Sequence, residues 1–276
     1  MRSDFSYRVF LRKGTVKSLF YRNRKKMEFY NGIFSSDWQF AALAFCALLI
    51  GFSKTGIQGA VVVSIPMMAL AFGAKESTGV ILPMLCFADL IAVAYYRRDA
   101  DWRLVLKLLP SAVVGFFAAL VAGSFVSGRG FGILMASCIF IGLVTMFVAR
   151  GERAQKIAKS GKCAVLFGIL GGFTTMIGNA AGPVMSVYLL SAGLPKRSFV
   201  GTSAWFFLLV NYMKIPLQVF AWDNIGAQAL KAGACGIPFI FIGAILGVRL
   251  VNIVPEKFFR ALVVLSTIVG TIIMVI

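Results

Sequence analysis

Hydrophobic runs about as long as a bilayer is thick constrain this chain more than any other feature. Most of them reach the roughly 20 residues that a helix needs to cross the hydrocarbon core. Apolar residues follow one another without the period-two alternation of barrel strands, which argues against a membrane β-barrel. The pattern predicts an all-α polytopic membrane protein. In chain order the runs cover residues 38–53, 57–72, 77–96, 105–125, 130–148, 163–178, 183–193, 198–220, 231–251 and 258–276.

The charge content agrees with a membrane protein. Only 14% of the residues are charged and 59% are hydrophobic, whereas roughly 25% of residues are charged in ordinary soluble domains. The formal net charge is +18, which in a soluble chain would suggest nucleic acid. Here the basic residues lie mostly between the hydrophobic runs, as the positive-inside rule describes. We therefore expect a lipid bilayer as a partner and no nucleic acid.

The residue types needed for most catalytic and metal chemistry are scarce. The chain has no histidine, and its five cysteines form no C-x-x-C pair. Histidine metal ligands and imidazole bases are therefore excluded, and a disulfide framework or zinc site has almost no support. We expect no metal, no cofactor and no catalytic residue, and we interpret the cysteines as small apolar residues within the spans.

Two apolar stretches are interrupted by glycines and small polar residues. Residues 51–59 read GFSKTGIQG, and residues 171–183 read GGFTTMIGNAAGP. A renewed apolar run follows each break and carries a proline, Pro66 in one case and Pro183 in the other. These renewed runs are short, which predicts half-helices or re-entrant segments that are buried in protein or line a wet cavity. Paired breaks in two halves of a chain are typical of a transporter's substrate site near the bilayer midplane.

Spacings between polar, glycine and proline anchors recur in the two halves. The recurring pairs are Gly79 to Asp89 and Gly201 to Asn211, ten residues apart, and Pro110 to Gly115 and Pro238 to Gly243, five residues apart. The shared order predicts two homologous repeats of about four to five helices each, with the glycine-broken segments at the repeat interface.

Basic clusters predict the domain boundaries and the orientation. A basic arm covers residues 1–30 and a basic linker covers residues 151–162. They flank a first transmembrane repeat, 31–150, and precede a second, 163–276. The positive-inside rule places the arm and the linker in the cytoplasm. The side of the C-terminus stays open.

Three segments resemble one known family. They are GFSKTGIQG followed by Pro66, the loop 101–103 that leads into Pro110, and GNAAGP at 178–183. Their order resembles the TauE/SafE family, also called the sulfite exporter or four-toluene-sulfonate uptake permease family, over about residues 40–276. The resemblance implies a bacterial inner-membrane permease for small, often sulfur-containing anions such as sulfite, sulfonates, sulfoacetate or thiosulfate. In one departure, Asn179, Ala180 and Ala181 stand where glycines are common in the family, which predicts a less open backbone there.

The first break supplies the strongest candidate for a substrate contact. Lys54 is a cation between two apolar runs, and intramembrane cations are costly and usually functional. If the chain unwinds at Gly56 and Gly59, the next half-helix presents free N–H groups and its positive dipole end. Together with Lys54, Thr55 and Gln58, these groups can replace the water around an oxyanion. The alternative is a lysine that snorkels to a water interface.

The second break supplies a matching half-site without charge. Its hydroxyl, amide and N–H groups suit an oxyanion, although small residues here also suit close helix packing. The candidate residues are Thr174, Thr175, Gly178, Asn179 and Gly182.

Three further polar residues within apolar runs are predicted to couple to the site or lie beside it. Asp89 is the only acid in the interior of a strongly apolar run, so we expect it to carry a coupling proton or to pair with Lys54 in the empty state. Asn211 is its neutral counterpart, and a hydrogen bond that merely joins helices is the alternative for both. Lys214 either faces the substrate path or, as the favoured interpretation, snorkels.

These observations predict a secondary transporter of a small, sulfur-containing anion that works by alternating access. The predicted partners are the anionic substrate and the lipid bilayer, and a homo-oligomer is left open. One alternative is a membrane-embedded enzyme for lipid-linked substrates, which the scarcity of intramembrane acids and the lack of histidine disfavour. Another is a passive anion channel, for which the sequence shows no continuous polar stripe. The residues do not decide the anion, the direction of transport or the coupling ion.

Overall fold

The computed structural model describes residues 33–125, 137, 160–263 and 265. Every regular element within these residues is a helix, which confirms the predicted all-α class. The basic arm, most of the linker, nearly all of the hydrophobic run 130–148 and most of the last run lie outside the described residues.

Contacts divide the chain into two units, Met1–Phe40 and Ala41–Ile276. In the first unit, helix α2 (Asp37–Thr55) begins with a reciprocal cap. The backbone N–H of Gln39 donates to Ser36 Oγ, and Gln39 Oε1 accepts from the N–H of Ser35. Such caps satisfy N–H groups that have no partner inside a helix. The rest of α2 and all later helices belong to the second unit.

Six of the described helices are long and apolar enough to cross a membrane, which confirms a multi-pass membrane protein. One of them, α10, continues through a π-helical turn, η2, which directly follows a proline. The six are α2, α4 (Glu76–Tyr96), α5 (Trp102–Ser124), α8 (Gly161–Gly178), α10 (Lys196–Pro216, extended by Leu217–Ala221) and α11 (Ala227–Ile253).

Both predicted breaks are present, and each separates a long helix from a short one. In the first half, α2 ends at Thr55, and a 3-10 helix η1 (Gln58–Val63) leads directly into α3 (Ser64–Phe72). In the second half, α8 ends at Gly178 and α9 (Ala181–Ser191) follows. With 9 and 11 residues, α3 and α9 are too short to span the hydrocarbon core, so the prediction of half-helices is confirmed.

The second break turns at one residue in a left-handed conformation. Asn179 has φ 56° and ψ 24°, and its N–H bonds back to the last turn of α8. This conformation favours glycine, and asparagine is the residue type that tolerates it next best. Asparagine therefore makes the turn that glycine would make, while the prediction of a less open backbone stays a prediction.

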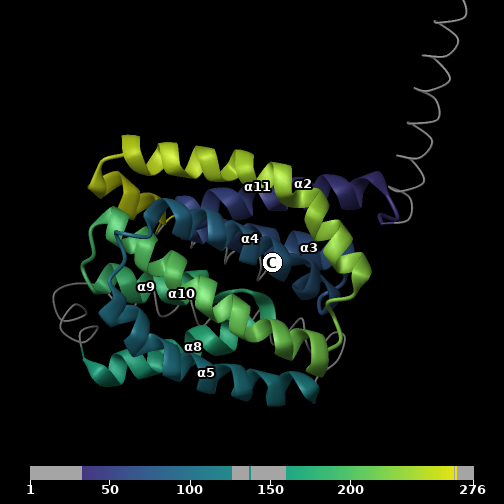
Figure 1. Cartoon of the computed structure of the whole chain (residues 1–276), viewed down its shortest axis with the longest axis horizontal. Helices are drawn as coiled ribbons and strands as arrows, with labels where there is room; N and C mark the ends of the chain where they lie inside the picture. Colours follow the sequence, from purple (N-terminus) through teal and green to yellow (C-terminus); the bar gives the residue numbers. More distant parts are fainter. Residues whose placement is uncertain (1–32, 126–136, 138–159, 264, 266–276) are drawn as a thin grey trace, which may run out of the picture. The chain divides into compact units, whose positions relative to one another are not determined.

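Close packing joins the first long helix of each half to a late helix of the other half. A Cβ atom added to Gly51 of α2 would overlap the carbonyl oxygen of Ile240 in α11. A Cβ atom added to Gly172 of α8 would likewise overlap the carbonyl oxygen of Ala112 in α5. Backbones this close are possible only where side chains are absent. Within the second unit, α2 therefore lies beside α11 and α5 beside α8 (Figure 1).

The two helix pairs use matching positions. Gly51 and Gly172 are 121 residues apart, and their contacts Ala112 and Ile240 are 128 apart. A Cβ atom added to Gly243 would overlap the carbonyl oxygen of Leu48, and one added to Gly115 would overlap that of Ile169. These residues are related by the same two offsets (243 − 115 = 128 and 169 − 48 = 121).

A hydrogen bond also recurs between the halves, at offsets of 122 and 121 residues. Tyr96 Oη donates to the carbonyl oxygen of Thr55 at 3.0 Å, and Gln218 Nε2 donates to that of Met176 at 3.4 Å. Tyr96 and Gln218 are 122 residues apart, and Thr55 and Met176 are 121 apart. The correspondence supports two repeats, which stay a prediction, and shows that the halves interlock.

Helices α4 and α10 lie between the two outer pairs. They pack against each other, while α4 also contacts α11 and α10 also contacts α5 (Figure 1). The middle of each central helix is therefore inside the protein, and it carries Asp89 in α4 and Asn211 in α10. Both side chains are almost completely buried.

Candidate functional site

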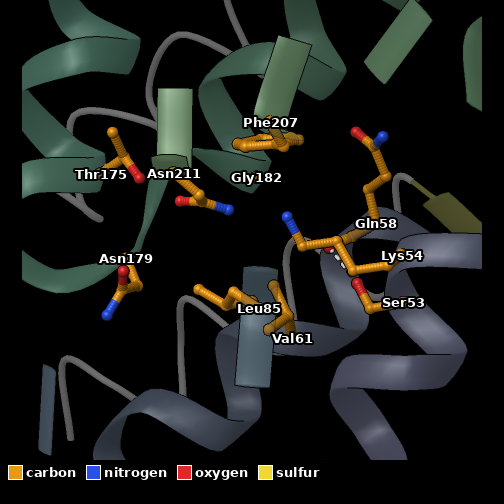
Figure 2. Close-up of a pocket in the computed structure, with 10 residues that line it drawn as sticks. All are labelled: Ser53, Lys54, Gln58, Val61, Leu85, Thr175, Asn179, Gly182, Phe207 and Asn211. Atoms are coloured by element: carbon orange, nitrogen blue, oxygen red, sulfur yellow. Dashed lines mark hydrogen bonds between the residues drawn. The ribbon is translucent and has the colours of Figure 1, made fainter. Parts of the chain in front are cut away.

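A small internal cavity lies where the two breaks meet the central helices (Figure 2). Its volume is about 10 Å³, which is close to the space for one water molecule. The lining residues are Ser53, Lys54, Gln58 and Val61 from the first break, Thr175, Asn179 and Gly182 from the second, and Leu85, Phe207 and Asn211 from α4 and α10.

Lys54 is the cation at this cavity. Its side chain is 7% exposed, and its Nζ lies 2.8 Å from Asp89 Oδ1. The same Nζ lies 4.0 Å from the centre of the Phe207 ring, in the arrangement of a cation–π contact. The predicted pairing of Lys54 with Asp89 is therefore present. A snorkelling amine must reach water or lipid headgroups, so that alternative is wrong for Lys54.

Asp89 and Asn211 meet directly across α4 and α10. Asn211 Nδ2 donates to Asp89 Oδ2 at 2.6 Å, so one carboxylate oxygen faces the amide and the other faces Lys54. A buried ion pair needs such additional hydrogen bonds to offset the desolvation of both charges. The bond joins two helices and also orients the carboxylate beside the cavity, so both interpretations of this pair are consistent with it.

Two amide oxygens at the cavity have no hydrogen-bond partner among the described residues. They are Gln58 Oε1 and Asn211 Oδ1, on side chains that are 3% and 1% exposed. Because Asn211 Nδ2 is committed to Asp89, its oxygen is left as an acceptor. Buried polar atoms without partners cost stability and are commonly kept where a ligand or water binds.

Lys214 is buried, and the favoured interpretation of a snorkelling side chain is wrong. Its Nζ donates to the carbonyl oxygen of Thr175 at 3.0 Å, to Thr175 Oγ1 at 2.9 Å and to Asn179 Oδ1. Asn179 Nδ2 in turn donates to the carbonyl oxygen of Thr78 at 3.3 Å. Lys214 therefore ties α10 to the end of α8 and to the left-handed turn. Thr175 and Asn179, its two partners, both line the cavity.

The start of α9 brings backbone donors to the same place. The N-cap residue Ala180 offers no side-chain acceptor to the first turn of the helix. The first N–H groups of an α-helix have no intrahelical partner, and the dipole adds partial positive charge there. A Cβ added to Gly182 would lie 3.3 Å from the carbonyl oxygen of Gln58. A glycine here lets the two breaks approach each other.

The structure brings together six of the predicted site residues and places others elsewhere. Lys54, Gln58, Thr175, Asn179, Gly182 and Asn211 line the cavity, while Asp89 and Lys214 contact its lining residues. Figure 2 shows Lys54 and Gln58 on one side, Thr175 and Asn179 on the other, and Asn211 between them.

Thr55 is placed for packing and not among the residues that line the cavity. Its Oγ1 donates to the carbonyl oxygens of Gly51 and Ala244. Gly56 packs closely against Gly247, so it too supports the contact of α2 with α11. The remaining predicted residues hold the elements of the breaks: Thr174 bonds within α8, Gly178 is the last residue of α8, and Gly59 belongs to η1.

Four lining residues were missed, namely Ser53, Val61, Leu85 and Phe207. A signal for two of them exists in the sequence. Leu85 precedes Asp89 by four residues, and Phe207 precedes Asn211 by four. Residues four apart share a helix face, so the predicted positions of Asp89 and Asn211 point to them. Leu85 and Phe207 are also 122 residues apart, the offset of Asp89 and Asn211.

Comparison with known proteins gives one match. The model of the family described as sulfite exporter TauE/SafE matches residues 43–274. The comparison found no similar protein among curated proteins and no similar solved structure.

Proposed function

We propose, from the premise that this chain belongs to the sulfite exporter TauE/SafE family of membrane transporters, that it is a secondary transporter of a small, sulfur-containing anion. Sulfite, a sulfonate, sulfoacetate and thiosulfate are the substrates to test. The proposal places the anion in the cavity between the two breaks and includes alternating access as the mechanism.

The buried ammonium group of Lys54 at the cavity is the observation that carries the proposal. Lys54 and the start of α9 lie on opposite breaks, so a cation and a helix N-terminus face one small space. Both favour a negative charge, and the effect is strong where water is excluded. Thr175 Oγ1 and the Gln58 amide add polar contacts suited to oxyanion oxygens.

Asp89 pairs with the ammonium group that the substrate would use. An entering anion therefore competes with Asp89 for Lys54. Asn211 still holds the other carboxylate oxygen, so Asp89 does not need to leave the site. Intramembrane carboxylates commonly take part in proton relays, so Asp89, which would lose its contact with Lys54, is the candidate for a coupling proton.

The packing suggests which parts move during alternating access. Backbone contacts join α2 to α11 and α5 to α8 through glycines that leave no room for adjustment. The first break follows α2 and the second follows α8, so the cavity lies between these two helix pairs. We propose that the pair α2 and α11 moves relative to the pair α5 and α8, and that the two sequence halves do not move as separate units.

The other function classes are less well supported. The family is one of transporters, which is consistent with a protein that is not an enzyme. A channel needs a continuous polar path, whereas Val61, Leu85 and Phe207 contribute apolar lining on the described part of the cavity.

Counterflow in proteoliposomes tests the proposal. Labelled sulfite, thiosulfate, sulfoacetate and taurine, with an unrelated carboxylate as comparison, are offered to vesicles preloaded with the unlabelled compound. We expect saturable counterflow of at least one sulfur anion, lost in Lys54→Gln and retained in Lys231→Gln, which alters an exposed lysine of α11. Linear flux without counterflow would indicate a channel, and no flux of any anion would overturn the proposal.

Location and orientation belong to the same proposal. We place the protein in the bacterial inner membrane with the basic arm 1–30 and the linker 151–162 in the cytoplasm, between transmembrane repeats 31–150 and 163–276. An N-terminal tag should resist external protease in spheroplasts and be cleaved after lysis. Cleavage in intact spheroplasts would reverse the orientation.

A further inference from the structure

Three charged side chains are buried among the residues that the structure describes, and their charges do not balance. Lys54 is 6% exposed, and Asp89 and Lys214 are each 0% exposed. Two positive charges and one negative charge leave one positive charge (2 − 1 = 1). An uncompensated charge in a low-dielectric interior is costly, so such groups are normally paired or meet a ligand.

The positive charge left over belongs to Lys214. Asp89 uses one oxygen for Lys54 and the other for Asn211, so its charge compensates Lys54. The acceptors around Lys214 Nζ are a carbonyl, a hydroxyl and an amide, and none of them carries a charge. They satisfy the hydrogen bonds of the ammonium group but do not compensate its charge.

This excess charge acts at the cavity, because the Lys214 ammonium group contacts residues that line the cavity. Both side-chain partners of Lys214, Thr175 and Asn179, line the cavity opposite Lys54 (Figure 2).

Lys214 supplies the positive charge that the second break itself lacks. At the offset of 121 residues that relates Gly51 to Gly172, Lys54 corresponds to Thr175, which is neutral. The Lys214 ammonium group lies 2.9 Å from the Thr175 hydroxyl. At the offset of 122 that relates Asp89 to Asn211, Lys214 corresponds to Ala92 in α4. Each half of the site thus has one ammonium group, supplied from a different helix.

We infer that the site is matched to a singly charged anion and that Lys214 is the residue that sets this charge. The inference rests on the proposed function and names the class of substrate. A monoanion in the cavity brings the buried cluster to zero, because two cations then face Asp89 and the substrate. A dianion would leave one negative charge in a space shielded from water. Sulfonates with one charge and hydrogen sulfite fit this rule, whereas sulfate and thiosulfate do not.

Methanesulfonate and sulfate form a suitable pair of probes because they are both tetrahedral, similar in size and different in charge. Counterflow of each labelled anion is measured in proteoliposomes at neutral pH. For the wild-type protein we expect half-saturation by methanesulfonate at a concentration at least about tenfold below that for sulfate, as the burial of an unbalanced charge demands.

Substitutions that change the charge of the cluster should move the preference in opposite directions. Lys214→Gln lowers the cluster charge to zero and should increase the preference for methanesulfonate, because sulfate would then leave two negative charges and methanesulfonate only one, while Lys214→Arg should keep the wild-type preference. Asp89→Asn raises the charge to two and should shift the preference toward sulfate. The double substitution Asp89→Asn with Lys214→Gln returns the charge to one and should restore the preference for methanesulfonate.

The outcomes separate this inference from the proposed function. If no anion shows counterflow with the wild-type protein, the proposed function fails. If counterflow occurs but the wild-type protein prefers sulfate, or neither Lys214→Gln nor Asp89→Asn changes the ratio of the two half-saturation concentrations, the charge rule is overturned. Thermal unfolding in detergent shows whether Lys214→Gln folds. If it does not, Asp89→Asn decides the charge rule alone because it leaves Lys214 in place.

Discussion

The two breaks occupy matching positions in the chain and differ in their chemistry. The first carries its own cation, Lys54, at the end of α2, and Asp89 balances it at 2.8 Å. The second carries no charge at the corresponding Thr175 and receives an ammonium group from Lys214 of α10. Backbone packing is therefore shared between the halves, while the charged groups are not.

The turns differ as well. The first break passes through a 3-10 helix into α3, and the second reverses sharply at the left-handed Asn179 before α9. Backbone packing depends on small residues at a few positions, which a duplicated sequence can keep in both halves. Side chains at the cavity are free to diverge, because a substrate without two-fold symmetry does not need identical contacts from both sides. The differences between the breaks thus indicate where function lies.

The largest effect should come from removing the charge of the first break. Lys54→Ala leaves Asp89 buried without its cation, which should lower the free energy of unfolding by about 3–5 kcal/mol and abolish transport. Lys54→Gln combined with Asp89→Asn removes both charges and should recover most of the stability without recovering transport. Thermal unfolding and counterflow measure the two effects. Transport by the stable double variant would show that the first break is not the anion site.

Substitution of the matching glycines should lower stability equally in both halves. Gly243→Ala and Gly115→Ala each place a Cβ against a carbonyl oxygen of the neighbouring helix, and each should cost about 1–3 kcal/mol of stability. Gly161→Ala, where an added Cβ meets no atom within 4 Å, serves as the control. Chemical unfolding of the three variants in detergent provides the comparison. A large effect at one glycine and none at the other would weaken the correspondence between the halves.

The left-handed turn should separate backbone from side-chain effects in the second break. Asn179→Ala should lower stability by about 1–2 kcal/mol relative to Asn179→Gly, because alanine is strained at positive φ whereas glycine is not. Both variants lose the contact with Lys214 and should impair transport to a similar degree. Unfolding midpoints and counterflow rates distinguish the two contributions. Equal stability of the two variants would contradict the conformation of this turn.

The smallest effects are expected at the recurring hydrogen bonds. Tyr96→Phe and Gln218→Leu each remove one donor to a backbone carbonyl oxygen, and Gln218→Leu also removes the acceptor of a 3.4 Å bond from Thr78 Oγ1. Each should cost about 1 kcal/mol, as for a typical buried hydrogen bond. Thermal unfolding of the single variants and of the double variant tests whether the two contributions are equal and add. A neutral result for one variant alone would restrict the equivalence of the halves to the glycine contacts.

Much of the site could be predicted from local sequence, and the failures have physical causes. Lys54, Asn179 and Gly182 stand at breaks in apolar runs, where polar groups are costly unless used. Lys214 was misinterpreted because a lysine late in a span looks the same whether its amine turns outward or inward. Thr55 was assigned to the substrate because a sequence does not show which side of a helix end faces the neighbouring helix.

The sequence alone determined that the chain is helical, crosses a membrane several times and is broken twice, because bilayer thickness and unsatisfied backbone groups act on each segment locally. Only the tertiary structure decided that the halves interlock through α2 with α11 and α5 with α8, and that Asp89 pairs with Lys54 while Lys214, among the described residues, bonds neutral acceptors. These facts depend on which distant segments approach each other. Such approaches arise from packing of the whole chain, and no local pattern records them.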